Sequence, residues 1–310
     1  MKYFIAGGTG FIGRFLIEHL LQKKEQVTAL VRDEARYTPS GKELKTVSGD
    51  PLKHGPWQEE ARAADVIINL TGSPIMTNWT EKARQMILDS RVNSTMNIVS
   101  ALKQAEPRVF ICANAVGYYG PRGDEPVYDQ DPPGNNFLAQ VAVKWQEAAM
   151  QASEYGHRVI VPRFPAVLGP NGGALSEMLP IFRKGLGGKL GNGKQWFPWV
   201  HITDLVRGLH FVSKNTSISG ALNLCSPQTL TNAEFTRALG KVLKRPAFLR
   251  VPEVALKMAY GDVATMLLTG QKCIPQVLQE NDFVFRFAHI DKALQDIISR
   301  WKQPGLAGPL

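Results

Sequence analysis

Short apolar, β-branched runs alternate with amphipathic stretches over the first two-thirds of the chain. Runs of this kind are typical of strands that are buried on both faces of a parallel sheet. The stretches between them place apolar residues at helical spacing, most clearly over 81–104 and 137–155. The pattern predicts the α/β class, with a doubly wound parallel sheet between two layers of helices. Six strands are expected, at 3–6, 26–31, 44–47, 66–70, 109–113 and 159–163.

The character of the chain changes after Gly169, where a glycine-rich segment begins and mainly helical patterns follow. The later helices are expected at 232–243, 254–269 and 290–301. We therefore predict a sheet domain over residues 1–225 and a small, mainly helical C-terminal lobe on the substrate side over residues 226–310. The boundary is approximate, because such lobes often take chain from several places.

A glycine-rich segment, GGTGFIG, occupies residues 7–13, after the first expected strand and before the first expected helix. It fits both Gly-x-Gly-x-x-Gly and Gly-x-x-Gly-x-x-Gly. Such glycines allow a tight turn, let main-chain N–H groups approach a pyrophosphate and bring the helix close to the strand. Residues 1–225 are therefore expected to form a Rossmann-like dinucleotide-binding domain. The predicted contacts in this loop are Gly7, Thr9, Gly10, Phe11, Ile12 and Gly13.

The second strand ends at Arg32, where an NAD-binding protein would carry an acidic residue for the ribose hydroxyls. A guanidinium at this place pairs with a 2′-phosphate, and Arg14 in the first helix adds charge. The sequence therefore favours NADP as the cofactor. The alternative is that Arg32 faces solvent and Asp33 holds an NAD ribose.

Further cofactor contacts are expected where later strands end, because open α/β sheets bind ligands at that edge. Asp50 follows the third strand and could accept a hydrogen bond from the adenine amino group or cap a helix. Leu70, Thr71 and Gly72 follow the fourth strand.

The composition excludes several other classes. The 310 residues are 44% hydrophobic, yet no apolar run is long enough to span a membrane. Three scattered cysteines without metal-ligand spacing indicate reduced thiols, a cytoplasmic protein and no metal site. The net charge of +9 comes without a run of five Lys or Arg, so it favours anionic metabolites over nucleic acid. Neither a nucleic acid nor a membrane is expected as a partner.

Three further segments resemble the extended short-chain dehydrogenase/reductase superfamily: ANAVGYYG (113–120), RFPAVLGP (163–170) and WVHITDL (199–205). Longer stretches, such as 185–205 and LTGQKCIPQVL (268–278), resemble the atypical branch usually called the epimerase family protein. Its members carry a small C-terminal domain of unknown function, here about residues 247–295. The resemblance covers almost the whole chain. It implies an NADP-binding Rossmann protein without establishing a reaction.

Ordinary members of that superfamily use a Tyr-x-x-x-Lys helix for acid–base chemistry, beside a Ser or Thr at a strand end. In those members the lysine lowers the pKa of the tyrosine and holds the nicotinamide ribose, and the resemblance places Lys144 at this catalytic and cofactor-binding position. Gln140 stands where tyrosine belongs, and an amide does not shuttle protons. Asn114 and Ala115 replace the hydroxyl residue. The substitutes considered are Tyr118 and Tyr119, which follow the fifth strand.

Three interpretations follow from the replacement of the Tyr-x-x-x-Lys pair by Gln140 and Lys144. One of the two tyrosines replaces the missing group, or hydride transfer takes its proton from water or substrate, or the protein binds NADP without turnover. We predict an NADP-dependent oxidoreductase of epimerase-like architecture acting on an unidentified small metabolite. The alternative is a non-catalytic NADP-binding regulatory or interaction protein.

Three remaining features are expected to be structural. His201 and Asp204 lie near a helix start, and no Gly-x-Ser-x-Gly motif accompanies them, so a hydrolase triad is not expected. Arg91 either anchors its helix to a neighbouring loop or faces a second copy of the chain. In ordinary members the helix that corresponds to residues 80–104 forms a homodimer, and the resemblance extends this expectation here.

Overall fold

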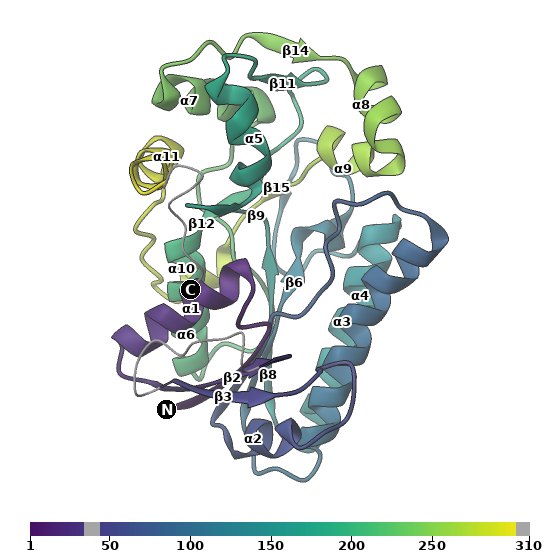
Figure 1. Ribbon diagram of the computed structural model, residues 1–310, viewed down its shortest axis with the longest axis vertical. Helices are drawn as coiled ribbons and strands as arrows, with labels where there is room; N and C mark the ends of the chain where they lie inside the picture. Colours follow the sequence, from purple (N-terminus) through teal and green to yellow (C-terminus); the bar gives the residue numbers. More distant parts are fainter. Residues whose placement is uncertain (34–43, 302–310) are drawn as a thin grey trace.

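The computed structural model describes residues 1–33 and 44–301, and it confirms the doubly wound parallel sheet (Figure 1). The strand order is β13-β8-β5-β4-β1-β2-β3, with β6 also paired to β8, and every pairing is parallel. The strands of this sheet are β1 (Lys2–Ala6), β2 (Gln26–Val31), β3 (Leu44–Ser48), β4 (Val66–Asn69), β5 (Val109–Cys112), β6 (Asn114–Ala115), β8 (Arg158–Phe164) and β13 (Gly220–Asn223).

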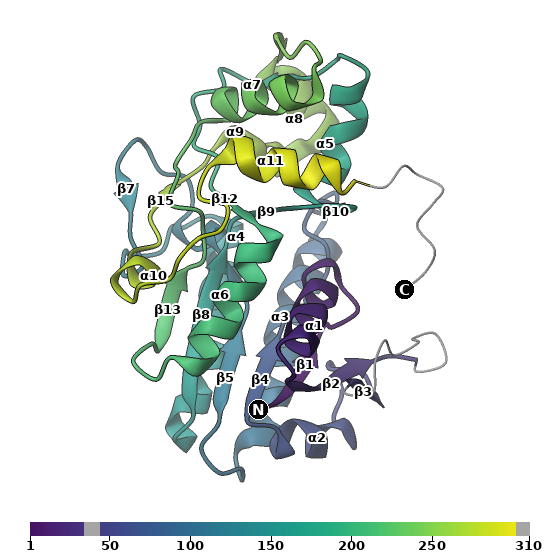
Figure 2. The same ribbon diagram turned by 90° about the vertical axis from the view of Figure 1, so that its left-hand side faces the viewer.

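Helices cover both faces of the sheet. Helices α1 (Phe11–Gln22) and α6 (Ile202–Lys214) lie on one face, and α3 (Glu81–Leu102) and α4 (Phe137–Met150) lie on the other (Figures 1 and 2). The short helix α2 (Trp57–Ala63) precedes β4, and the 3₁₀ segment η3 (Gln151–Tyr155) completes the stretch expected to be one helix with α4. Because both faces are covered, β4 is buried along its whole length, which explains the apolar run that precedes its last residue, Asn69.

Two helices on the same face begin with side-chain caps that the sequence supplies. Thr80 accepts a hydrogen bond from the N–H of Ala83 at the start of α3. Asn136 accepts one from the N–H of Ala139 at the start of α4. Each cap satisfies a donor that the helix itself leaves unpaired. The caps fix where both helices start, close to the carboxyl edge of the sheet.

A lobe sits above the carboxyl edge of the sheet, at the top of Figure 1. Its apolar core takes residues from both sides of position 225, including Leu175, Phe182, Phe235 and Leu294. Its helices are α5 (Ala174–Arg183), α7 (Asn232–Leu243), α8 (Glu253–Tyr260), α9 (Ala264–Leu268) and α11 (Ile290–Ser299). The helix expected at 254–269 is divided by the 3₁₀ segment η4 (Gly261–Val263), where Gly261 has a φ of +54°.

Small sheets join the lobe to the main domain or lie within the lobe itself. In the two-stranded sheets, β7 (Pro126–Val127) pairs with β15 (Lys272–Cys273), and β11 (Gly188–Leu190) pairs with β14 (Leu249–Val251). In the three-stranded sheet, β9 (Ala166–Gly169) lies between β10 (Gly172–Gly173) and β12 (Trp199–His201). The 3₁₀ segment η2 (Val116–Tyr119) follows β6, and α10 (Gln276–Glu280) precedes the segment that leads to α11.

His201 and Asp204 connect α6 to the lobe, as their expected structural role requires. His201 Nδ1 accepts a hydrogen bond from the N–H of Thr203, so Nε2 carries the proton that points to the Asp296 carboxylate of α11, 3.2 Å away. The Asp204 carboxylate accepts hydrogen bonds from the N–H groups of Arg286 and Phe287, at 2.9 and 2.7 Å. Both side chains are thus fully used in holding the lobe against the sheet domain.

The buried His201 predicts a stability that falls with acid. Burial lowers its pKa from 6.5 to about 4. Between these values the unfolded chain takes up a proton that the folded chain does not, so the free energy of unfolding decreases as pH falls from 6.5 toward 4. We expect His201→Asn, which keeps a capping group, to cost about 1–3 kcal/mol at pH 7 and to reduce this pH dependence. Urea unfolding at pH 7 and pH 5 measures both effects, and an unchanged pH slope would contradict the assignment.

Candidate functional site

The glycine loop lies at the carboxyl end of β1, and two of its glycines are required by packing. Gly7 has a φ of +82°, and a Cβ there would lie 2.9 Å from the carbonyl carbon of Leu70. A Cβ on Gly13 would overlap the Gly7 carbonyl oxygen and lie 2.6 Å from the Cα of Gly8. A Cβ on Gly10 would meet only the Gly7 oxygen, at 3.3 Å, and Gly10 is exposed. The loop therefore keeps its shape through Gly7 and Gly13 and leaves open space beside Gly10.

The first turn of α1 faces this open space. The helix begins at Phe11, and its N-cap residue Gly10 provides no side-chain hydrogen bond. The first N–H groups of a helix have no intrahelical acceptor, and they carry the positive end of the helix dipole. Thr9 is exposed and Ile12 is half-buried beside them. This geometry suits an anionic group such as a pyrophosphate.

The Phe11 side chain also makes a contact outside the glycine loop. Its ring packs against the β9–β10 hairpin, where three glycines leave room for it. A Cβ on Gly172 would lie 2.7 Å from Cε2 of Phe11, and a Cβ on Gly173 would lie 2.8 Å from Cε1. The GPNGG segment is therefore rich in glycine because an aromatic ring occupies its side-chain space. In the sequence this signal is divided between two separate motifs, the glycine loop and the GPNGG segment, so the contact is visible only in the fold.

Arg32 follows β2 next to the glycine loop, because β2 pairs with β1 up to the contact of Ala6 with Leu30. The side chain of Arg32 is exposed, and its carbonyl oxygen accepts a hydrogen bond from Ser48 Oγ at 3.4 Å. Asp33 and Arg14 are also exposed. The guanidinium is therefore available to a ligand at this end of the sheet.

Asp50 follows β3 and forms a local turn. Its Oδ1 accepts a hydrogen bond from the N–H of Leu52 at 3.0 Å. The next helix, α2, begins later, at Trp57 with Pro56 as its N-cap. Asp50 is thus not a helix cap, and its second carboxylate oxygen makes no hydrogen bond within residues 1–33 and 44–301.

A buried polar network supports the loop after β4. Thr71 Oγ1 donates a hydrogen bond to Asn69 and contacts Ser94 Oγ at 2.8 Å. Thr95 Oγ1 accepts hydrogen bonds from Asn69 Nδ2 and from the Trp145 indole, both at 3.0 Å. The network joins β4, α3 and α4 through hydrogen bonds that water does not reach. It fixes Leu70, Thr71 and Gly72 at the sheet edge.

Arg91 anchors its helix to the same loop, which is one of the two roles expected for it. It donates hydrogen bonds to the carbonyl oxygens of Ser73, at 3.1 Å, and Ile87, at 2.9 Å. A Cβ on Gly72 would lie 3.0 Å from the guanidinium carbon, so only glycine fits over it without displacement. Burial lowers the pKa of Arg91 to about 10, and no carboxylate pairs with it in the described chain. Arg91 therefore remains a cation at neutral pH.

Tyr119 has a structural role in the fold. It is fully buried, its hydroxyl donates to Asn223 Oδ1 at 2.7 Å, and it accepts from Arg163 Nη1 at 2.7 Å. Burial raises its pKa far above the usual value. A tyrosine engaged on both sides in this way is not placed to exchange a proton with a ligand.

Tyr118 is in a different position. The guanidinium carbon of Arg163 lies 3.6 Å from the centre of its ring, as in a close cation–π contact. Arg163 is itself buried, and it also donates to Gln146 Oε1 at 2.9 Å. The Tyr118 hydroxyl makes no hydrogen bond within the described residues. Of the two adjacent tyrosines, only Tyr118 has a free hydroxyl.

Lys144 lies on α4, and its expected role beside the strand ends stays a prediction. Asn114 Nδ2 donates to the carbonyl of Ala142 at 2.9 Å, and Leu138 is the nearest neighbour that a Cβ on Gly117 would meet, at 3.7 Å. These contacts define the face of α4 that meets β6 and η2. Lys144 projects about 160° around the helix from Ala142. It is exposed, as is Gln140.

Comparisons with known proteins identify the family. The family model described as NAD dependent epimerase/dehydratase family matches residues 3–225, and a domain of unknown function matches residues 251–297. The chain belongs to the NAD dependent epimerase/dehydratase family.

Relatives of this family member cover almost its full length. It is 37% identical to epimerase family protein SDR39U1 of Mus musculus, over 96% of this chain and 100% of the relative. It is 34% identical to the chloroplastic SDR39U1 homolog of Arabidopsis thaliana, over 96% of this chain and 87% of the relative. The crystal structure of human SDR39U1 (isoform 2) with NADPH superposes with a TM-score of 0.84 at 31% identity, covering 97% of this chain and 100% of that one.

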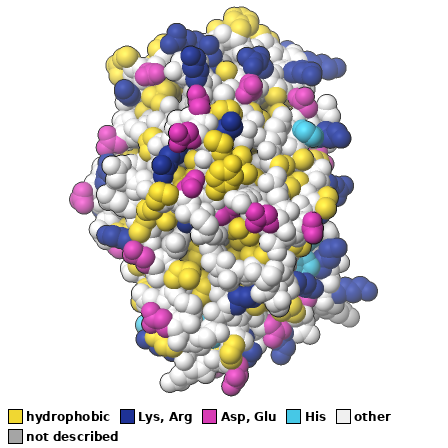
Figure 3. Space-filling model, turned by 180° about the vertical axis from the view of Figure 1, so that it is seen from behind, with side chains coloured by type: hydrophobic (Ala, Val, Ile, Leu, Met, Phe, Trp, Pro, Cys, Tyr) yellow, Lys and Arg dark blue, Asp and Glu magenta, His cyan; other side chains and the backbone are white. Residues whose placement is uncertain are grey.

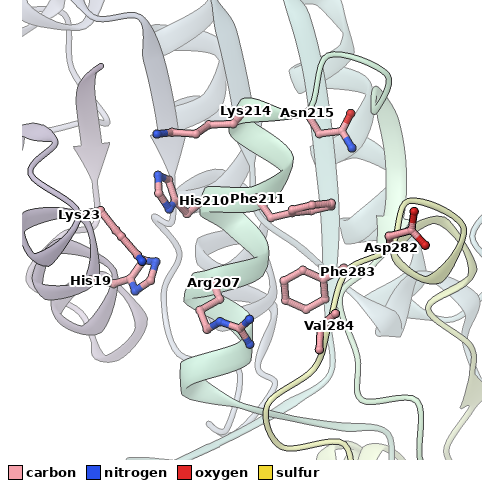
Figure 4. A pocket seen from close by; sticks show the side chains of 10 residues that line it. All are labelled: His19, Lys23, Arg207, His210, Phe211, Lys214, Asn215, Asp282, Phe283 and Val284. Carbon is pink, nitrogen blue, oxygen red and sulfur yellow. The ribbon is translucent and has the colours of Figure 1, made fainter.

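A separate groove of this family member lies away from the glycine loop. It has a volume of about 630 Å³ and opens between α1, α6 and the segment 282–284 (Figure 4). Two of its cations already have acidic partners: Lys214 contacts Glu25 at 2.5 Å, and Arg207 contacts Asp204 at 2.7 Å. These pairs compensate most of its charge, so we do not assign the groove a ligand.

The described part of the chain has neither a cluster of metal-ligating side chains nor a helix that could cross a membrane. Residues 1–33 and 44–301 contain no group of three His, Cys, Asp or Glu side chains that could hold a metal ion. In the same ranges, none of the helices has the length and apolar character needed to cross a membrane.

The loop geometry predicts stability effects of very different size for alanine substitutions at Gly13 and Gly10. Gly13→Ala places a methyl group against main-chain atoms that cannot move without opening the β1–α1 turn, so we expect a loss of at least about 2–3 kcal/mol. Gly10→Ala adds its methyl group to open space and is expected to change stability by less than about 1 kcal/mol. Urea unfolding of both variants tests this difference. Equal destabilisation would show that the loop does not depend on the Gly13 contact.

Proposed function

We propose that this chain binds NADP(H) and is an oxidoreductase that acts on an unidentified small metabolite. The observation that carries the proposal is the glycine loop, which is closed by packing at Gly7 and Gly13 and open beside Gly10 and the first turn of α1. The human relative whose structure was determined with NADPH supports the same cofactor for this chain.

Arg32 supports NADP over NAD. Its exposed guanidinium lies at the end of β2, next to the loop that would hold the pyrophosphate. Arginine suits a phosphate monoester because it offers a planar set of donors and a permanent charge. The residues proposed to hold the cofactor are Gly7, Thr9, Gly10, Phe11, Ile12, Gly13, Arg32, Asp50, Leu70, Thr71 and Gly72.

Tyr118 is the proposed source of the proton. Bound NADPH supplies a hydride to a carbonyl carbon, and the carbonyl oxygen then needs a proton. Tyr118 follows β6 at the carboxyl edge of the sheet, its ring is held by Arg163, and its hydroxyl has no partner in the described chain. The Tyr119 hydroxyl is occupied on both sides, so it does not support the proposal in a catalytic role, whereas the exposed Lys144 stays a candidate to hold the nicotinamide ribose.

A non-catalytic NADP-binding regulatory protein is the second candidate. It is favoured by the face of α4 that meets the strand ends, where Leu138 and Ala142 offer no titratable group. A cytoplasmic location and a homodimer through α3 stay predictions. The location is supported by three buried cysteines without disulfide partners, and the dimer by exposed Met86 and Met96 on α3.

Cofactor preference tests the role of Arg32. We expect the wild-type protein to bind NADPH about 10- to 100-fold more tightly than NADH, which is the effect of one or two charge-assisted hydrogen bonds. Arg32→Glu should remove this preference by weakening NADPH binding alone. Gly10→Val, which fills the space beside the loop, should weaken both cofactors. Isothermal titration measures the affinities, and equal wild-type affinities would contradict the NADP assignment.

A pair of tyrosine variants tests the proton donor. With NADPH and a panel of carbonyl substrates, Tyr118→Phe should lower kcat by about 10²- to 10⁴-fold and leave the melting temperature unchanged. Tyr119→Phe is the matched control, because it removes one hydroxyl from a buried network and should mainly lower the melting temperature. An active Tyr118→Phe enzyme would exclude Tyr118 as the donor. Tight NADPH binding without turnover of any substrate would favour the regulatory protein.

A further inference from the structure

Two segments meet at the end of the lobe that is farthest from the N-terminus. Residues 181–188 and 244–250, which we call the lobe tip, are joined by the parallel pairing of β11 with β14. Gly185 lies against Pro246, since a Cβ there would be 3.4 Å from its ring. Figure 1 shows β11, β14 and α7 at the outer end of the lobe. The tip is therefore a convex end of the molecule and not part of a cleft.

The lobe tip exposes large apolar side chains to an unusual degree. Phe248 is 79% exposed, Leu186 57%, Ile181 52% and Leu249 40%. Single exposed apolar residues are normal on a protein surface, but four on two adjacent segments indicate a contact surface. Helix α8 follows β14 directly and adds Met258, which is 83% exposed.

The charge of the lobe tip has one sign. The two segments carry five cations and neither Asp nor Glu: Arg183, Lys184, Lys244, Arg245 and Arg250. In the described parts of the chain, none of the five has a carboxylate partner within 4.0 Å. The space-filling view shows dark blue and yellow side chains at the top of the lobe, with magenta ones below and beside them (Figure 3). The tip thus combines uncompensated positive charge with protruding apolar groups.

We propose that the lobe tip docks on the surface of an anionic lipid bilayer. Lys and Arg side chains bind the acidic headgroups, while Phe248, Leu186 and Ile181 enter the boundary between headgroups and acyl chains. A nucleic acid would use the cations but not the apolar side chains, and a small anion would need a concave site. A lipid surface matches the charge, the apolar groups and the convex shape together.

This inference is independent of the proposed cofactor, because the tip shares no residue with the glycine loop. It also changes one expectation from the sequence. No membrane partner was predicted because no segment could span a bilayer, whereas docking on a surface requires no spanning segment. The protein would lie on the membrane through the lobe and keep the sheet domain in water.

Vesicle sedimentation tests the proposal with the full chain. The vesicles contain phosphatidylcholine with about one-third phosphatidylglycerol, or phosphatidylcholine alone, at salt concentrations of about 0.1 and 1 M. We expect wild-type protein to sediment with the anionic vesicles at low salt, and weakly with the neutral ones. The double variant Lys244→Gln/Arg245→Gln should lower the partition more than tenfold, since each cation contributes about fivefold. Phe248→Ser/Leu186→Ser should lower it by a similar factor at both salt concentrations.

Matched controls change equivalent residues elsewhere. Val284→Ser removes an apolar side chain that is 73% exposed. Lys2→Gln/Lys53→Gln removes two exposed cations of the sheet domain, outside the lobe tip. Neither control should change the partition, and all variants should keep the wild-type melting temperature. Absence of wild-type binding to anionic vesicles, or an equal loss in the controls, would overturn the proposal. Full vesicle binding by Phe248→Ser/Leu186→Ser, with retention on immobilised heparin, would overturn it in favour of a general polyanion surface.

Discussion

The close approach of Gly13 to the main chain of Gly7 and Gly8 is the contact on which the site depends. It allows α1 to start directly above the end of β1, so that the first turn of the helix points at the sheet edge. The same geometry directs Phe11 sideways into the β9–β10 hairpin. From there β9 pairs with β12, and β12 ends at His201, whose ring contacts Phe287 and whose Nε2 faces Asp296. A continuous series of packed contacts therefore connects the glycine loop to α11 of the lobe.

Two arginines, the buried Arg163 and the half-buried Arg91, form part of the walls around the carboxyl edge of the sheet. Arg91 supports the turn at Gly72, and Arg163 holds the ring of Tyr118. A buried guanidinium without a carboxylate partner is costly, because it loses its hydration. Both recover part of that loss through hydrogen bonds to carbonyl and side-chain oxygens. Since Arg91 remains charged at neutral pH, it also favours an anionic ligand over the loop that it supports.

The sequence predicted the features that local patterns determine. Buried strands and the glycine loop leave distinct signals within a few residues, and the structure contains all of them. Strand β13 was not predicted, because Gly-Ala-Leu-Asn is too short to stand out, and it exists through its pairing with β8. The break between α8 and α9 was missed for a similar reason, because one glycine at 261 decides it.

The candidate catalytic residues show where sequence spacing stops being informative. The i, i+4 spacing places Gln140 and Lys144 on the same face of α4, but spacing does not say which face meets the sheet. That depends on tertiary contacts, such as the hydrogen bond from Asn114 to Ala142. Likewise, Tyr118 and Tyr119 are adjacent in sequence but have different contacts. Arg163 lies over the ring of Tyr118, whereas the Tyr119 hydroxyl hydrogen-bonds with both Arg163 and Asn223.

The net charge of +9 illustrates the same limit, because a sum does not say where the charges lie. The structure separates them into groups with different physical consequences. Arg163 is buried and Arg91 half-buried beside the sheet edge, where water screens their charges less than at the surface. The cations of the lobe tip are on the surface, so salt weakens their attraction for any partner. Binding at the sheet edge should therefore resist salt better than contact through the tip, even though both draw on the same positive excess.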